Sequence, residues 1–151
     1  MEFSHNDEEL ARQPIGYWSW AAHKAAVGHI RAALAEHDLT QPRWWVLAQV
    51  AGSRAGRTRA EVTAVLEGYL DVGAALQPEI DTVLDRGWIA LGDDGRLVVT
   101  EEGGALFERV ARLQQELRAR IHDGIPDEEY VRTLKVLQRM IHNVGGKAWH
   151  H

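Results

Sequence analysis

The apolar positions of the chain fall into stretches with the period of a helix, separated by Gly, Pro and capping residues. The first stretch opens at Pro14, which suits the first turn of a helix because the missing N–H of proline would have no partner there. After it, residues at helical spacing form one stripe that consists of Trp18, Ala22, Ala25, His29 and Ala33. The pattern predicts a long first helix that ends near His37.

Two shorter helices are predicted next from their end signals. Thr40 is a favourable N-cap, Pro42 lies in the first turn and Gly52 is a stop signal, which together predict a helix of roughly three turns. The sequence TRAE then has the capping-box pattern, in which Thr58 and Glu61 satisfy each other's end donors. The helix that it opens is expected to contain Val62, Val65, Leu66 and Tyr69.

A turn-like link, DVGAAL, leads to a fourth helix and a hairpin. A proline inside a helix costs about 3 kcal/mol, so Pro78 should lie near the start of a short helix. That helix is expected from Gln77 to Arg86, and Gly87 ends it. The β-prone runs WIAL and RLVV then flank GDDG, which is a hairpin turn signal.

Two further helices complete the pattern. Thr100 can cap a fifth helix, and the sequence DGIP breaks it. Its apolar side chains fall at three- and four-residue steps at Leu106, Val110, Leu113, Leu117 and Ile121. A sixth helix is expected to start at Asp127 and to stop at Gly145. Its apolar stripe consists of Val131, Leu134, Leu137 and Ile141.

This order of elements predicts a mainly α fold with a small β-hairpin wing. Residues 1–12 are expected to be a flexible leader and residues 13–151 a single domain. Within it, 38–100 form a winged helix-turn-helix lobe, flanked by long terminal helices at 13–37 and 101–145. Terminal helices with apolar stripes cannot bury themselves on so small a core, so we expect them to pair with a second copy in a two-fold dimer.

Composition narrows the class of protein. The chain has 151 residues, 45% of them hydrophobic, which is ordinary for one globular domain. It has no cysteine, and no apolar run approaches the ~20 residues that span a membrane. The start, MEFSHNDEEL, is acidic and polar and unlike a signal peptide, so a cytoplasmic location is expected. The net charge of −5 argues against indiscriminate nucleic-acid binding.

Several segments resemble the MarR family of winged-helix regulators. LTQPRWWVLAQV is similar to the family's second-helix pattern, VLDRGWI to the end of its recognition helix, and VVTEEGGALFERV to the passage from wing to dimer helix. The resemblance covers about Pro14 to Val144, and the order of elements carries it. It implies a homodimer that binds palindromic operators in double-stranded DNA. It also implies release by small aromatic or phenolic ligands, bound between the dimer helices and the lobe.

The segment that would read DNA departs from the family because it is acidic. Residues 58–100 contain three arginines against eight acids. The family's wing typically carries an Asp-Arg-Arg-like run, whereas the turn here is GDDGR. The fourth helix, QPEIDTVLD, has Glu79 and Asp81 near its start, where phosphate neutralisation would call for Lys or Arg.

Three features could compensate for this acidity and allow DNA binding: a basic loop, side chains on the fourth helix that read base edges, and acids that face the protein and are paired there. The side chains expected on the DNA backbone are Arg54, Arg57, Arg59, Arg86 and Arg96, with Gln77 and Thr82 at base edges. The alternative for the loop SRAGRTR is a solvated turn. The alternative for Gln77 and Thr82 is plain helix surface.

Aromatic residues gather on the first two helices. The candidate ligand contacts are Tyr17, Trp18, Trp20, His23, Trp44 and Trp45. Adjacent residues on a helix point about 100° apart, so Trp44 and Trp45 cannot face the same way. One interpretation is a Trp-lined cavity, edged by an imidazole, for a flat aromatic or carboxylate ligand. The other is packing in the core or at the dimer interface.

Other chemistry is not indicated. His23, His29 and His37 lack the i, i+4 spacing that puts a metal-binding pair on one helix face, and His150 and His151 would bind metal only adventitiously. The chain has no Gly-rich phosphate loop and no nucleophile elbow, so no enzyme, cofactor or resident metal is expected.

Two functions are therefore weighed. The first is a dimeric DNA-binding regulator, acting as a repressor that responds to a small aromatic ligand. The second is a winged-helix dimer that has lost DNA binding and serves as a small-molecule-binding, catalytic or interaction protein. If Glu79, Asp81 and Asp85 all pointed outward without an arginine beside them, the second would be favoured.

Overall fold

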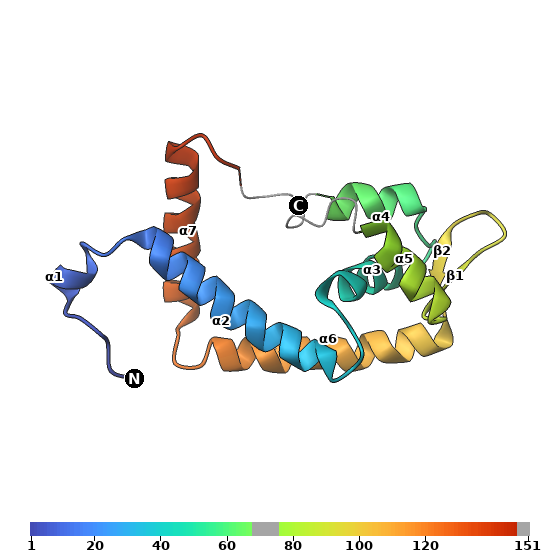
Figure 1. The fold of residues 1–151 in the computed structure, drawn as a ribbon, viewed down its shortest axis with the longest axis horizontal. Coiled ribbons are helices and arrows are strands. Elements are labelled where there is room, and N and C mark those ends of the chain that lie inside the picture. The colour runs from blue at the N-terminus through green and yellow to red at the C-terminus, as the bar shows by residue number, and fades with distance from the viewer. Residues whose placement is uncertain (68–75, 148–151) are drawn as a thin grey trace.

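The computed structural model describes residues 1–67 and 76–147, and these form a mainly helical fold with one antiparallel hairpin (Figure 1). The elements are α1 (Asp7–Leu10), α2 (Ile15–Ala35), α3 (Gln41–Ala51), α4 (Arg59–Leu66), α5 (Leu76–Asp85), β1 (Ile89–Leu91), β2 (Leu97–Val99), α6 (Glu101–Ile121) and α7 (Asp127–Asn143). The predicted fold class is confirmed. The expected link 71–76, apart from its last residue, and the positions of Tyr69, His150 and His151 lie outside the described residues.

The predicted helix caps are present as hydrogen bonds. Thr40 Oγ1 accepts from the backbone N–H of Arg43 at 3.3 Å. Thr58 and Glu61 form the reciprocal capping box, at 3.1 and 2.7 Å. Thr100 Oγ1 accepts from Gly103 N–H at 3.0 Å and so opens α6. These bonds satisfy end donors that no carbonyl inside the helix can reach, which is why the helices begin where they do.

Two details at the N-terminal side differ from the sequence prediction. Pro14 occupies the N-cap position just before α2 and not its first turn. Within the segment expected as a leader, residues 7–10 form the one-turn helix α1, which Asn6 and Glu9 close with a capping box.

The core of the lobe is built around α3. This helix packs against α4, α5, α6 and β2, and its Val46, Leu47 and Val50 are fully buried. Ile80 and Val83 of α5 enter the same cluster. The lobe therefore holds α4, α5 and the hairpin in fixed positions at one end of α6, as Figure 1 shows.

The wing is a short hairpin joined to the loop before α4. Ile89 pairs with Val99 and Leu91 with Leu97, and GDDG forms the turn as predicted. A bridge between Arg57 and Leu97 adds the loop to the hairpin. Gly56 has φ +68°, and a Cβ there would lie 2.6 Å from the Leu97 carbonyl oxygen, so only glycine fits. The loop is thus fixed against the wing.

The terminal helices leave apolar surface uncovered. α2 packs along α6, where Leu34 and Leu117 are buried, and Leu34 belongs to the core cluster of the lobe. α7 stands at the end of α6 remote from the lobe (Figure 1) and has no buried residue. Large apolar side chains are exposed on α2 and α7 at Ile15, Tyr17, Trp18, Trp20, Val131, Leu134, Val136 and Met140.

Candidate nucleic-acid interface and ligand cavity

The outer face of α5 is the surface that a winged helix-turn-helix presents to the major groove. Leu76, Ile80 and Val83 point into the core. The opposite face exposes Asp81 and Asp85 beside a proline. Asp81 and Asp85 therefore make the exposed face of α5 acidic. We call residues 58–100, which include α4, α5 and the hairpin, the head.

Asp81 is paired with an arginine of α4. Arg59 Nη2 lies 2.7 Å from Asp81 Oδ1, and Arg59 Nη1 donates to Gln77 Oε1 at 3.3 Å. Gln77 Nε2 in turn donates to Thr63 Oγ1 at 2.9 Å. The expected base reader Gln77 is thus half-buried and engaged between α4 and α5.

Glu61 is paired with the arginine of the wing. Arg96 Nη2 lies 2.9 Å from Glu61 Oε2, and Arg96 also donates to the backbone carbonyls of Ala55 and Gly56, at 3.0 and 3.1 Å. The backbone N–H of Thr58 lowers the pKa of Glu61 below its ordinary value, and the charge of Arg96 adds to this effect. Arg96 therefore ties the wing to the start of α4.

Two further pairs hold the sides of the lobe. Arg43 Nε of α3 lies 2.7 Å from Glu79 Oε2, and both side chains are about three-quarters buried. Glu79 is therefore turned to the body of the protein and not to solvent. Arg86 Nη1 lies 2.7 Å from Asp38 Oδ2, and this hydrogen bond lowers the pKa of Asp38. The Arg86 guanidinium also lies 5.4 Å from the ring centroid of Trp88.

The other expected DNA contacts are placed differently. Arg57 is half-buried, and its Nε donates to the Gln49 carbonyl at 2.9 Å. Thr82 Oγ1 donates to the Pro78 carbonyl at 2.9 Å. Arg54 is exposed and has no ion pair within residues 1–67 and 76–147. The structure contains the third of the possible compensations, the pairing of acids with arginines.

The expected aromatic contacts do not converge on one cleft. Tyr17, Trp18 and Trp20 are exposed at the start of α2, with the Tyr17 and Trp18 ring centroids 5.4 Å apart. Trp44 instead stacks on Phe107 of α6, with the ring centroids 5.4 Å apart and the ring planes at 14° to each other. Trp45 also packs against the core of the lobe. The physical reason is the length of α2.

The axial separation of the two groups follows from helix geometry. Trp18 and Leu34, which reaches the lobe, are sixteen residues apart on one helix, or about 24 Å at 1.5 Å per residue. His23 is exposed on the part of α2 between them.

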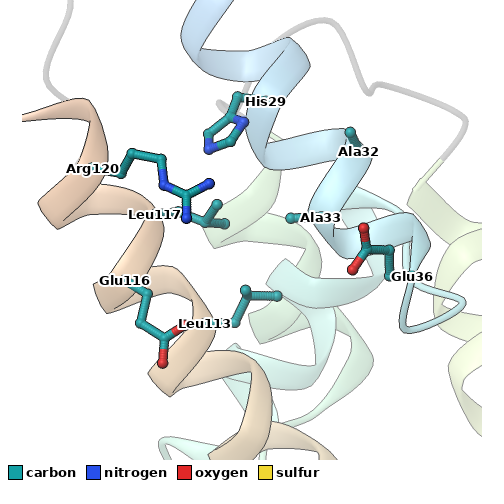
Figure 2. Close-up of a pocket in the computed structure, with 8 residues that line it drawn as sticks. All are labelled: His29, Ala32, Ala33, Glu36, Leu113, Glu116, Leu117 and Arg120. Atoms are coloured by element: carbon teal, nitrogen blue, oxygen red, sulfur yellow. The ribbon is translucent and has the colours of Figure 1, made fainter.

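A cavity that the sequence did not single out lies between α2 and α6 (Figure 2). Its volume is about 220 Å³, and its wall is formed by His29, Ala32, Ala33, Glu36, Leu113, Glu116, Leu117 and Arg120. A second, shallower hollow of about 360 Å³ shares His29 and Arg120 with it. No side chain of the predicted aromatic set lines either space. The cavity exists because the alanine side chains of α2 are too small to fill the space between the two helices.

Polar groups converge on this cavity from both helices. Figure 2 shows His29 and Arg120 pointing towards each other across the gap, with Glu36 and Glu116 farther along it. His29 Nε2 is buried without a hydrogen-bond partner, which costs on the order of 1–3 kcal/mol. A single histidine in an otherwise alanine-rich helix stripe was the available sequence signal. The site can accept an anion beside Arg120 and an apolar ring against Leu113 and Leu117.

Metal-binding clusters and membrane-spanning helices are both absent from residues 1–67 and 76–147. Residues 1–67 and 76–147 contain no group of three or more His, Asp or Glu placed to hold a metal ion. No helix in this part of the chain combines the length and the apolar character needed to cross a membrane.

Comparison with known proteins identifies the fold. No family model and no curated protein matches the chain. A MarR family transcriptional regulator from Silicibacter pomeroyi aligns with a TM-score of 0.69 and 14% identity, over 93% of this chain and 99% of that one. CouR from Rhodococcus jostii RHA1, solved with p-coumaroyl-CoA, aligns with a TM-score of 0.68 and 22% identity, over 85% and 91%.

A third neighbour was solved with DNA. The Mycobacterium tuberculosis MarR family protein Rv2887 in its DNA complex aligns with a TM-score of 0.65 and 20% identity, over 85% of this chain and 98% of that one. The same protein was also solved with p-aminosalicylic acid, and that structure aligns with a TM-score of 0.59 and 20% identity, over 89% and 100%. Likeness at these identities establishes the fold, which is the winged helix of MarR family structures.

Proposed function

We propose that the chain is a dimeric, DNA-binding transcriptional repressor of MarR type that a small aromatic ligand releases from its operator. The observation that carries the proposal is the pairing of the acids on its reading head. Glu61, Glu79 and Asp81 each lie within 3 Å of an arginine side chain, so three carboxylates that would repel phosphate are partly neutralised. The full-length likeness to MarR family regulators, one of them solved with DNA, supports the same function.

DNA binding is tested by fluorescence anisotropy. The protein is titrated against duplex DNA from the region upstream of its own gene, with a scrambled duplex as control, at several salt concentrations. A repressor binds the upstream duplex selectively and loses affinity as salt rises, because bound cations of the DNA are released on contact. No binding at the lowest salt contradicts the proposal and favours a winged-helix dimer without DNA binding.

The dimer is supported by the apolar side chains that the single chain leaves exposed on α2 and α7. A second copy would cover them, and its two-fold axis would bring two heads to half-sites about 34–36 Å apart. Leu134→Glu places a charge on the exposed apolar face of α7 and is expected to give monomers in sedimentation velocity. Gln115→Glu is the control, because it adds the same charge at an exposed position of α6, a helix on which no large apolar side chain is exposed, and it should leave the dimer intact.

The exposed aromatic residues at the start of α2 fit the proposed dimer interface better than a ligand site. Tyr17, Trp18 and Trp20 lie at the end of α2 that is remote from the lobe, where α7 also lies, and we assign them to the contact between copies. Trp44 and Trp45 pack against the core of the lobe. We therefore propose that they affect the ligand site indirectly, through this core, and do not touch the ligand.

The ligand is proposed to occupy the cavity between α2 and α6. Its carboxylate would pair with Arg120 and accept from His29, and its ring would lie on Leu113 and Leu117. Two neighbours of similar fold were solved with p-coumaroyl-CoA and p-aminosalicylic acid, and both of these molecules carry an aromatic ring.

Thermal unfolding with p-aminosalicylate as the probe tests this assignment. A ligand at 100 times its Kd stabilises the native state by about 2.7 kcal/mol. Arg120→Met is expected to abolish the rise in Tm. Arg112→Met, on the same helix and outside the cavity wall, should retain it. Equal loss in both variants, or no rise in the wild type with p-aminosalicylate, contradicts the assignment.

A further inference from the structure

Two ion pairs of the head, Arg59–Asp81 and Arg96–Glu61, are more exposed than the pair between Arg43 and Glu79, and we call them the outer pairs. The side chains of Arg59 and Asp81 are 41% and 58% exposed, and those of Arg96 and Glu61 are 31% and 47% exposed. Arg43 and Glu79 are 24% and 21% exposed and hold α3 to α5. Exposed pairs contribute little to stability because water and salt screen them. The two pairs are therefore expected to add little to stability through the pairing itself.

The arginines in these outer pairs stand where a winged helix meets the DNA backbone. Arg59 is the first residue of α4, beside the outer face of α5, and Arg96 lies between the turn of the wing and β2. A guanidinium binds carboxylate and phosphate oxygens with the same donor groups. Arg59 Nη2 is already committed to Asp81, and Arg96 Nη2 to Glu61. A phosphate that reaches either arginine must share or displace a carboxylate.

We infer that Asp81 and Glu61 are internal competitors of the DNA phosphates, which hold Arg59 and Arg96 and thereby set the affinity of the reading head. This inference rests on the proposed DNA binding. Asp85 and Asp93 of the head do not act in this way. Asp85 and Asp93 are exposed, and neither makes an ion pair in the described parts of the chain. They repel DNA only through their charge.

The size of the effect follows from counterion release. One phosphate contact on duplex DNA changes the slope of log K against log salt by about 0.9. At 0.1 M salt one such contact corresponds to roughly an eightfold gain in affinity, and the gain vanishes near 1 M. Each arginine that is released from its carboxylate is expected to give a gain of this order.

The test compares two neutralised pairs with two matched controls. Asp81→Asn and Glu61→Gln remove the competing charge, and glutamine at position 61 keeps the capping box of α4. Asp85→Asn and Asp93→Asn remove the same charge from unpaired positions on the same helix and the same wing. Anisotropy with the upstream and scrambled duplexes is measured at several salt concentrations, after urea unfolding has confirmed that each variant is folded.

The expected result is selective for the paired positions. Asp81→Asn and Glu61→Gln tighten binding roughly eightfold each at 0.1 M salt and steepen the salt slope by about 0.9. The two controls leave the slope unchanged. Adding Arg59→Met to Asp81→Asn removes the gain, because Arg59 is the group that was released.

The remaining outcomes separate this inference from the proposed function. If the wild type binds and the paired variants behave like their controls, the inference is overturned and the function stands. If the wild type does not bind but Asp81→Asn with Glu61→Gln does, the inference is supported and the wild type is not a repressor under those conditions. If no variant binds even at the lowest salt, both are overturned.

Discussion

Gly103, at the start of α6, is the residue whose substitution by alanine we expect to be most informative about the fold. A Cβ at this position would lie 1.8 Å from the carbonyl oxygen of Trp88, where real contacts are at least 3.0 Å. That oxygen is held in place, since it accepts from the N–H and the hydroxyl of Thr100 at 3.1 and 3.2 Å. Relief therefore requires α6 to move away from the base of the wing by more than about 1 Å.

The magnitude follows from two opposing effects. Overpacking of this kind costs typically 1–3 kcal/mol, and contact with a fixed backbone atom places Gly103→Ala near 3 kcal/mol. Alanine in a helix recovers about 0.5–1 kcal/mol relative to glycine. The net loss is about 2–2.5 kcal/mol, which corresponds to a Tm lower by roughly 4–10 °C for a chain of this size.

The neighbouring glycine is the control. A Cβ at Gly104 meets nothing within 4 Å, so Gly104→Ala should gain about 0.5–1 kcal/mol and raise Tm by a few degrees. Both variants are followed by circular dichroism at one fixed protein concentration, because the Tm of a dimer depends on concentration. Similar Tm values for the two variants would refute the reasoning, since the two substitutions differ in the clash alone.

Further predictions concern the cap, the acids and the cavity. Thr100→Ala is expected to lower the free energy of unfolding by about 1 kcal/mol in urea titration, because α6 loses its N-cap; no loss would mean that the cap is dispensable. The folded-state pKa values of Asp38 and Glu61 are lowered. Their stabilisation is therefore complete at neutral pH and is lost as pH falls through their ordinary values, 3.8 and 4.5, towards the folded ones. In the Asp38→Asn variant, the urea midpoint of unfolding should fall less steeply below pH 5 than in the wild type. If it falls as steeply, the acid sensitivity comes from other carboxylates. His29→Leu removes a buried unpartnered nitrogen, so the urea midpoint should rise while p-aminosalicylate no longer raises Tm; a lower midpoint would show that the imidazole is paired in solution.

The sequence predicted the features that depend on neighbouring residues. Thr40, Thr58 and Thr100 cap helices as expected, because a cap needs only residues three positions away. GDDG forms the hairpin turn for the same reason. The order of these local elements was enough to predict a winged helix.

The sequence could not predict which groups meet across elements. The pairing of Asp81 with Arg59 spans twenty-two residues and depends on how α4 packs against α5. The separation of Trp18 from Trp44 depends on the length and direction of α2, which local patterns do not specify. The cavity at His29 exists because alanines of α2 face α6, and only the docked helices reveal that the space is unfilled.

The acidic character of the head bears on how such a protein would find its operator in a cell. A genome offers about 10⁶–10⁹ competing sites, and a regulator spends most of its time on them unless its general attraction to DNA is weak. Between residues 58 and 100, eight acids accompany three arginines, and each of those arginines is already paired with a carboxylate. If the head binds DNA as proposed, its affinity for non-specific DNA would be low. Few molecules per cell would then suffice to keep one operator occupied.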